Sequence, residues 1–222
     1  MVALHRHQLV RLNDAGWSAV RGRAWDEGAQ ACLAHWAAHG LPLVVTQQRD
    51  ALTDDQLALG LPTPLRWQRR RLALQVTLSD VLFFDEFPFA AEVTGLMSPA
   101  ARSAWRALLA ALDVAGATVR VYGSHGWQRI TGLGYLHAGS DMDLRLSAAD
   151  AAAADAVVAV LQAAPLAAPR LDGELTFPDG SAVAWREWSA WREGRVDRVL
   201  VKRLHGVAME TDDAWLGERA PC

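Results

Sequence analysis

Residues 119–128 read VRVYGSHGWQ, and this stretch joins a predicted strand to a predicted phosphate-binding turn. Apolar and polar residues alternate in VRV, which predicts a short strand, and Gly123 after it permits a tight turn. A helix that starts near His125 would leave backbone N–H groups at this turn free to bind a phosphate oxygen. We therefore expect Gly123 and Ser124 to bind phosphate, and His125 is a further candidate contact.

Two aspartates follow in residues 140–144, which read SDMDL. Side chains alternate across a strand, so Asp141 and Asp143 should lie on one face and Met142 and Leu144 on the other. Adjacent carboxylates repel each other unless a cation lies between them. Mg²⁺ prefers one or two carboxylates completed by water and substrate phosphates. The pattern predicts that Asp141 and Asp143 bind Mg²⁺.

Two domains are expected from the order of the predicted elements, over residues 1–86 and 87–222. The first should be a small α/β domain that binds substrate or partner. Its helix is predicted over residues 27–38, ended by Gly40, and a short helix capped by Thr53 over residues 54–58. Its strands are expected at residues 8–12, 41–48 and 72–78, with LGLPTP (59–64) as a loop.

The second domain should be catalytic, and its elements predict an α/β (α+β) fold with helices packed on a mixed sheet. Ser98 and Pro99 are expected to start an amphipathic helix, and Ser147 to cap an alanine-rich one that ends near residue 163. Strands are expected at 170–177 and 196–204, with PDG turning the first into a hairpin strand at 181–188.

Composition excludes several classes of function. The formal net charge is −3 with 22 Lys and Arg against 25 Asp and Glu, which argues against general nucleic-acid binding. Two cysteines give no disulfide framework, which indicates a reducing compartment. The N-terminal stretch resembles no signal peptide, and no apolar run has the length of a membrane span. We expect a cytoplasmic protein with no membrane partner.

A strand that ends in Gly-Ser, a later Asp-x-Asp strand and a third acid on another strand resemble the polymerase-beta-type nucleotidyltransferase superfamily. The third acid would be Asp172, with Glu174 on the same strand face as the alternative. The spacer between Ser124 and Asp141 is longer than is usual in that superfamily. The resemblance implies a mixed sheet, with Asp141, Asp143 and Asp172 as metal ligands.

A closer resemblance covers most of the chain. The segments RHQLVRL (6–12), GLPLVVTQQ (40–48), LGLPTP, YGSHGWQRITGLGYLHAGSDMDLRL (122–146) and LDGELTFPDGSAVAWREW (171–188) resemble phosphoribosyl-dephospho-CoA transferases, the holo-acyl-carrier-protein synthases of malonate decarboxylase. That family implies a donor, 2′-(5-triphosphoribosyl)-3′-dephospho-CoA, and an acceptor serine on the acyl-carrier subunit of malonate decarboxylase. It also implies that diphosphate is released.

Three further hypotheses complete the prediction. Lys202 is the single lysine of the chain and lies in a predicted apolar strand, where we expect it to bind phosphate.

Another small nucleotidyltransferase is the alternative within enzymes, either similar to the citrate lyase holo-carrier synthases or dependent on ATP. A non-catalytic domain that retains the fold is the alternative outside enzymes, although both members of the Asp-x-Asp pair are present.

Overall fold

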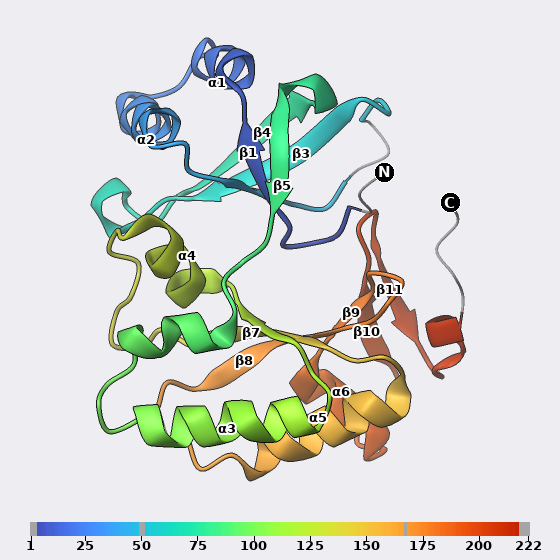
Figure 1. Cartoon of the computed structure of the whole chain (residues 1–222). Coiled ribbons are helices and arrows are strands. Elements are labelled where there is room, and N and C mark those ends of the chain that lie inside the picture. Colours follow the sequence, from blue (N-terminus) through green and yellow to red (C-terminus); the bar gives the residue numbers. More distant parts are fainter. Residues whose placement is uncertain (1–3, 49–51, 167, 218–222) are drawn as a thin grey trace. The chain divides into compact units, whose positions relative to one another are not determined.

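A computed structural model of the chain describes residues 4–48, 52–166 and 168–217 (Figure 1). The described residues form two compact units. The N-terminal unit contains the residues up to Phe87 together with Ile130–Tyr135 and Leu204–Gly206, and the C-terminal unit contains the remainder. Each unit has its own sheet and helices, which confirms the predicted mixed α/β class.

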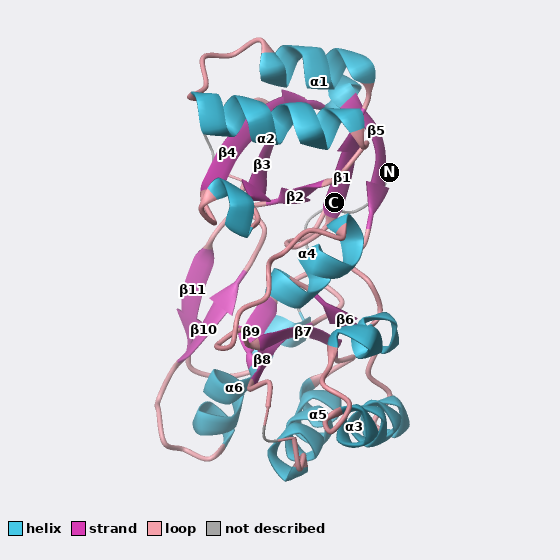
Figure 2. Cartoon of the chain, turned by 90° about the vertical axis from the view of Figure 1, so that its left-hand side faces the viewer, coloured by secondary structure: helices cyan, strands magenta, loops and turns pink. Residues whose placement is uncertain are grey.

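The sheet of the N-terminal unit is antiparallel, with strand order β4-β3-β2-β1-β5. Helices α1 and α2 lie on one face of this sheet (Figure 2). Asp26 caps α2 by accepting a hydrogen bond from the backbone N–H of Ala29. The elements are β1 (Leu9–Leu12), α1 (Asp14–Arg21), α2 (Glu27–Ala38), β2 (Leu43–Val45), β3 (Gln56–Pro62), η1 (Leu65–Trp67), β4 (Arg71–Thr77), η2 (Leu78–Asp80) and β5 (Val81–Asp85).

Several predictions for this unit are wrong, although the helix over residues 27–38 is confirmed. The short helix at 54–58 and the LGLPTP loop are replaced by strand β3. Alternate leucines at 57, 59 and 61 are buried, and this period of two outweighs the short polar run before it. Helix α1 and strand β5 were not predicted. Cys32 is buried and unpaired, and Cys222 lies outside the described residues.

Two segments from the second half of the chain belong to the N-terminal unit. The Tyr135 hydroxyl donates to the Pro62 carbonyl at 2.8 Å, and the Leu65 N–H donates to the Gly134 carbonyl at 2.9 Å. The Gln48 N–H donates to the carbonyl of residue 204 at 2.8 Å. These bonds fix both segments against the end of β3 and the residues that follow β2.

The C-terminal unit has a mixed sheet with strand order β11-β10-β9-β8-β7-β6. Strands β7 and β8 are parallel and are joined through helix α5, whereas the other pairings are antiparallel. The elements are η3 (Ala90–Leu96), α3 (Arg102–Val114), β6 (Val119–Val121), α4 (Gly123–Thr131), β7 (Met142–Ser147), α5 (Ala151–Ala163), β8 (Leu171–Thr176), β9 (Ala182–Ala184), α6 (Trp185–Arg192), β10 (Val199–Lys202), β11 (Val207–Glu210) and η4 (Ala214–Gly217).

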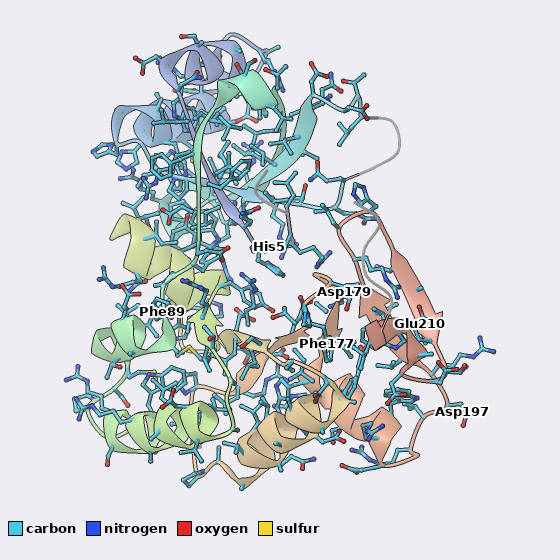
Figure 3. All side chains as sticks on the ribbon, turned by 45° about the vertical axis from the view of Figure 1, so that its right-hand side comes forward. His5, Phe89, Phe177, Asp179, Asp197 and Glu210 are labelled. Atoms are coloured by element: carbon cyan, nitrogen blue, oxygen red, sulfur yellow. The ribbon has the colours of Figure 1, made fainter. Side chains whose placement is uncertain are left out.

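Large aromatic side chains fill the core of this unit. Trp105 on α3 and Trp188 on α6 are fully buried, and α3 and α5 lie side by side beneath the sheet (Figure 1). Phe177, which follows β8, packs against Trp188 and Trp215 with ring centroids 5.5 and 5.2 Å apart. Asp179 accepts hydrogen bonds from Ser181 in the turn after Phe177 (Figure 3). The turn returns the chain into β9.

The prediction for the second strand of the hairpin is wrong beyond residue 184, because the residues WREW (185–188) begin helix α6. Local alternation in AVAWREW continues the strand period, but only AVA pairs with β8. Ser147 does not cap α5; Asp150 does, and it accepts from the Ala153 N–H at 2.9 Å. Helix α3 starts at Arg102, after a turn that contains Ser98 and Pro99. Among the described residues, no helix is long and apolar enough to cross a membrane.

Candidate active site

Strands β7 and β8 bring two aspartates together. Their parallel register pairs Asp143 with Asp172, and paired residues point to the same face of a sheet. Asp141 directly precedes β7, and Arg170 directly precedes β8. The ends of two neighbouring strands therefore assemble an acidic group from segments about thirty residues apart in the sequence.

Asp143 has the most perturbed environment in this group. Burial, followed by the neighbouring charges of Asp172 and Asp141, raises the pKa of its carboxyl from 3.8 to about 6. Arg170 acts in the opposite direction but does not compensate for these effects. A buried carboxylate beside like charges is a place where a cation would be stabilised.

Gly123 lies so close to Asp143 that no residue with a Cβ atom would fit at this position. It begins α4 with φ +58°, in the left-handed region that favours glycine. A Cβ atom built on Gly123 would lie 1.8 Å from the Asp143 Oδ2 atom, far inside van der Waals contact. The Tyr122 N–H also donates to the Asp143 carbonyl at 3.0 Å. The predicted phosphate turn, with Ser124 as the second residue of α4, thus lies directly beside the predicted metal ligand.

Arg170 is a site residue that the sequence reading missed. Its guanidinium forms a two-pronged ion pair with Asp141 and lies 3.6 Å from Asp172 Oδ2. This pairing lowers the pKa of the Asp141 carboxyl. The signal was available, because aligning SDMDL with RLDGE as parallel neighbours places Arg170 opposite Asp141.

Glu174 and Lys202 contact each other. Lys202 Nζ donates to Glu174 Oε1 at 2.7 Å, and Glu174 is only 5% exposed. Glu174 adds the smallest of the contributions that raise the pKa of Asp143, whereas Asp172 adds the largest of the neighbouring charges. Geometry therefore favours Asp172 over Glu174 as the partner of Asp143. Lys202 is paired with Glu174, and its predicted contact with phosphate stays a prediction.

His125 is buried on the inner side of α4. Its Nδ1 donates to the Asp141 carbonyl at 3.0 Å, which requires the proton on Nδ1. Burial lowers the pKa of the imidazole, which favours the neutral form. His125 thus holds the backbone before β7, a different contact from the phosphate contact predicted from its position in the turn.

The acids present carboxylate oxygens, which are the ligands that hard cations such as Mg²⁺ prefer. Within residues 4–48, 52–166 and 168–217, no group of three or more His, Cys, Asp or Glu side chains is arranged to hold a metal. Asp143 and Asp172 form a pair, and Asp141 is engaged by Arg170. Because magnesium sites in phosphoryl transfer commonly use one or two carboxylates and complete the shell with phosphates and water, this pair fits such a site.

These features define a class of protein: a two-unit α/β chain with an acidic strand pair beside a glycine-initiated helix, an arrangement suited to phosphoryl chemistry. Comparison with known proteins defines the family. Residues 5–87 match the N-terminal domain and residues 88–213 match the C-terminal domain of the phosphoribosyl-dephospho-CoA transferase MdcG. No solved structure matches the chain.

Curated relatives named phosphoribosyl-dephospho-CoA transferase agree with this match. One from Xanthomonas campestris pv. campestris is 37% identical over 96% of this chain and 97% of its own length. One from Bradyrhizobium diazoefficiens is 34% identical over 92% and 88%, and one from Pseudomonas putida is 33% identical over 83% and 85%. The chain belongs to the phosphoribosyl-dephospho-CoA transferase family, and it is a transferase.

Proposed function

We propose that this transferase moves the phosphoribosyl-dephospho-CoA group from 2′-(5-triphosphoribosyl)-3′-dephospho-CoA to a serine of the malonate decarboxylase acyl-carrier subunit. The observation that carries the proposal is the pairing of Asp143 with Asp172 beside the Gly123 turn in a chain of this family. We propose further that the reaction takes place in the cytoplasm, without a membrane or nucleic-acid partner.

The chemistry is an in-line displacement at phosphorus. The serine oxygen forms a bond to the α-phosphorus of the triphosphate arm, and the bond between that phosphorus and the diphosphate oxygen breaks. The serine proton passes to a carboxylate, and diphosphate leaves with the electron pair of the broken bond. The enzyme lowers the barrier mainly by positioning the reactants and stabilising charge.

The residues divide this work between binding and proton transfer. The N–H groups and hydroxyl at Gly123 and Ser124 bind the outer phosphates of the arm, which become the leaving diphosphate. Asp143 and Asp172 would hold Mg²⁺, which when bound supplies charge neutralisation at the transferring phosphate. Asp172, whose side chain is 38% exposed, accepts or orients the proton of the incoming serine.

Arg170 reduces the net negative charge of the acidic group that an anionic donor must approach. Its ion pair with Asp141 offsets part of the negative charge that the phosphates would otherwise meet. His125 fixes the Asp141 backbone by its hydrogen bond, so the segment that enters β7 keeps its position. Both residues thus hold the acids in place rather than react.

The test is a mass measurement on the acceptor. The full chain is incubated with Mg²⁺, the triphosphoribosyl-dephospho-CoA donor and the apo carrier subunit, and the carrier is weighed by mass spectrometry. We expect a gain equal to the donor minus diphosphate, absent from a carrier whose serine is alanine. Asp143→Asn should abolish the gain, whereas Asp197→Asn, on an exposed loop of the same unit, should not.

Other outcomes contradict the proposal in identifiable ways. Labelling of a citrate lyase carrier in preference to the malonate decarboxylase carrier would change the acceptor. Transfer from ATP to another hydroxyl would make the chain a different nucleotidyltransferase. The absence of transfer from either donor would support a non-catalytic role.

A further inference from the structure

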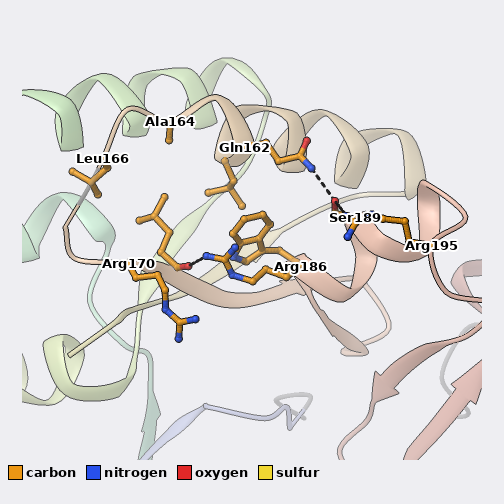
Figure 4. A pocket seen from close by; sticks show the side chains of 10 residues that line it. Gln162, Ala164, Leu166, Arg170, Arg186, Ser189 and Arg195 are labelled. Carbon is orange, nitrogen blue, oxygen red and sulfur yellow. Dashed lines mark hydrogen bonds between the residues drawn. The ribbon is translucent and has the colours of Figure 1, made fainter. Parts of the chain in front are cut away.

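A cavity of about 540 Å³ lies in the C-terminal unit between the end of α5, the segment before β8, and α6 (Figure 4). This volume falls within the range of small-molecule sites, roughly 300–1,000 Å³. Arg170 contributes to its wall and also pairs with Asp141. Arg170 therefore belongs both to the wall of the cavity and to the acidic group.

The wall of the cavity is positively charged. Arg170, Arg186 and Arg195 line it, and in the described part of the chain no acidic side chain does. Arg195 is paired with Glu193 at 2.8 Å, and Arg170 is paired with Asp141. Arg186 makes no ion pair with any described carboxylate, although its charge contributes to lowering the pKa of Asp141. It is therefore the cation of the wall with which a ligand can still form an ion pair.

Arg186 is held in place by neutral contacts. Its guanidinium donates to the Leu171 carbonyl at 2.8 Å and lies 4.3 Å from the centroid of the Trp185 ring. These contacts restrict the guanidinium without neutralising it. The Trp185 Nε1 atom is buried, and no described group accepts a hydrogen bond from it. A cation fixed in this way is suited to bind a phosphate, since little ordering remains to be done when the ligand arrives.

The remainder of the wall is of two kinds. Leu161, Leu166 and Leu171 give it an apolar side. Gln162 and Ser189 give it a polar end, where the Gln162 amide donates to the Ser189 hydroxyl at 2.8 Å (Figure 4). An inorganic anion would use only the cationic part. The combination suits a molecule in which a ring system is joined to a polyphosphate.

We propose that this cavity binds the nucleoside diphosphate portion of the donor, with Arg186 as the binding residue for its diphosphate. The assignment rests on the proposed function for the identity of the donor, whose dephospho-CoA portion contains adenosine joined to a diphosphate. Through Arg170 the cavity adjoins Asp141, which places the bound portion next to the acids that act on the triphosphate arm.

Calorimetric titration of the full chain tests the proposal without any transfer. The probes are 3′-dephospho-CoA, ADP and inorganic diphosphate, each at moderate ionic strength. Arg186→Gln should weaken dephospho-CoA and ADP about 10- to 100-fold, the range expected when a charged hydrogen bond is lost. Arg106→Gln removes the same charge from an exposed position on α3 and should stay within about twofold of wild type.

A second variant fills the cavity and leaves its charge unchanged. Ala164→Trp enlarges a lining side chain and should weaken dephospho-CoA and ADP more than inorganic diphosphate. A thermal melt shows whether Arg186→Gln folds. If it does not fold, Ala164→Trp still tests the cavity assignment. Wild-type affinity for dephospho-CoA in both variants would overturn the assignment. The assignment would also be overturned if inorganic diphosphate bound as tightly as dephospho-CoA and its binding were lost in the same variants.

The two proposals can fail separately. If dephospho-CoA binding follows the expected pattern but the carrier gains no mass, the cavity assignment stands and the proposed transfer fails. If the carrier is labelled and Arg186→Gln leaves both affinity and the KM for the donor unchanged, the transfer stands and the cavity assignment fails.

Discussion

Replacing Asp143 with asparagine should make the protein inactive and more stable. The folded-state pKa of Asp143 is about 6, against an ordinary value of 3.8. Because the folded chain holds this proton more tightly, ionisation costs stability as the pH rises from 3.8 to about 6. That cost in stability is absent below pH 3.8 and fully present above about pH 6. A difference of about two pH units corresponds to about 3 kcal/mol.

Asparagine keeps the shape of aspartate and removes the charge. No hydrogen bond from the Asp143 side chain to a described residue is lost with it, so most of the cost should be recovered. We expect a gain of about 1–3 kcal/mol at about pH 8. For a chain of this size that is a rise of about 3–9 °C in Tm.

Thermal melts in a chelator at about pH 8 and about pH 4 measure the effect. The gain of Asp143→Asn over wild type should be present at about pH 8 and nearly absent at about pH 4, where Asp143 is protonated in the folded chain. Asp197→Asn, which removes a charge from an exposed loop, should show no such difference. A variant that is no more stable than wild type at about pH 8 would refute the electrostatic reasoning.

Four further variants test neighbouring parts of the site. Gly123→Ala should lower the transfer rate at least about 100-fold, because its Cβ would displace Asp143; an unchanged rate would show that the close approach is not needed. Asp172→Asn should lower kcat about 100-fold or more without lowering Tm, because the loss of its charge relieves the repulsion of Asp143, whereas Glu174→Gln should lower stability by about 1–3 kcal/mol through the loss of its ion pair with Lys202; kinetics and melts that show the reverse would exchange the two roles. Arg170→Gln should move the acidic limb of the pH profile of kcat/KM to higher pH, because the guanidinium lowers the pKa of its carboxylate neighbours; an unmoved limb would exclude this coupling.

The parts of the site that were predictable from sequence are those fixed by local periodicity. Gly123 lies after a strand and Asp143 within one, so alternation places each on the correct element. The shared face of Asp143 and Asp172 follows from the same period once the strands are taken as neighbours. A helix between two strands makes that parallel pairing the expected one.

Contacts that depend on packing were outside the reach of the sequence. The Lys202 contact with Glu174 joins strands that are separated by β9, so no local pattern reveals it. The AVAWREW segment also misleads, since its alternation continues into residues that form α6. There the burial of Trp185 and Trp188 against the core outweighs the local strand preference.

The segments Ile130–Tyr135 and Leu204–Gly206 bear on how such a chain can be inherited. The first lies in the spacer between Ser124 and Asp141, and its Tyr135 is bonded to Pro62. A recombination event that exchanged only residues 1–87 would separate these partners. The two halves should therefore be inherited together. A functional chimera would have to carry three pieces of sequence from one parent.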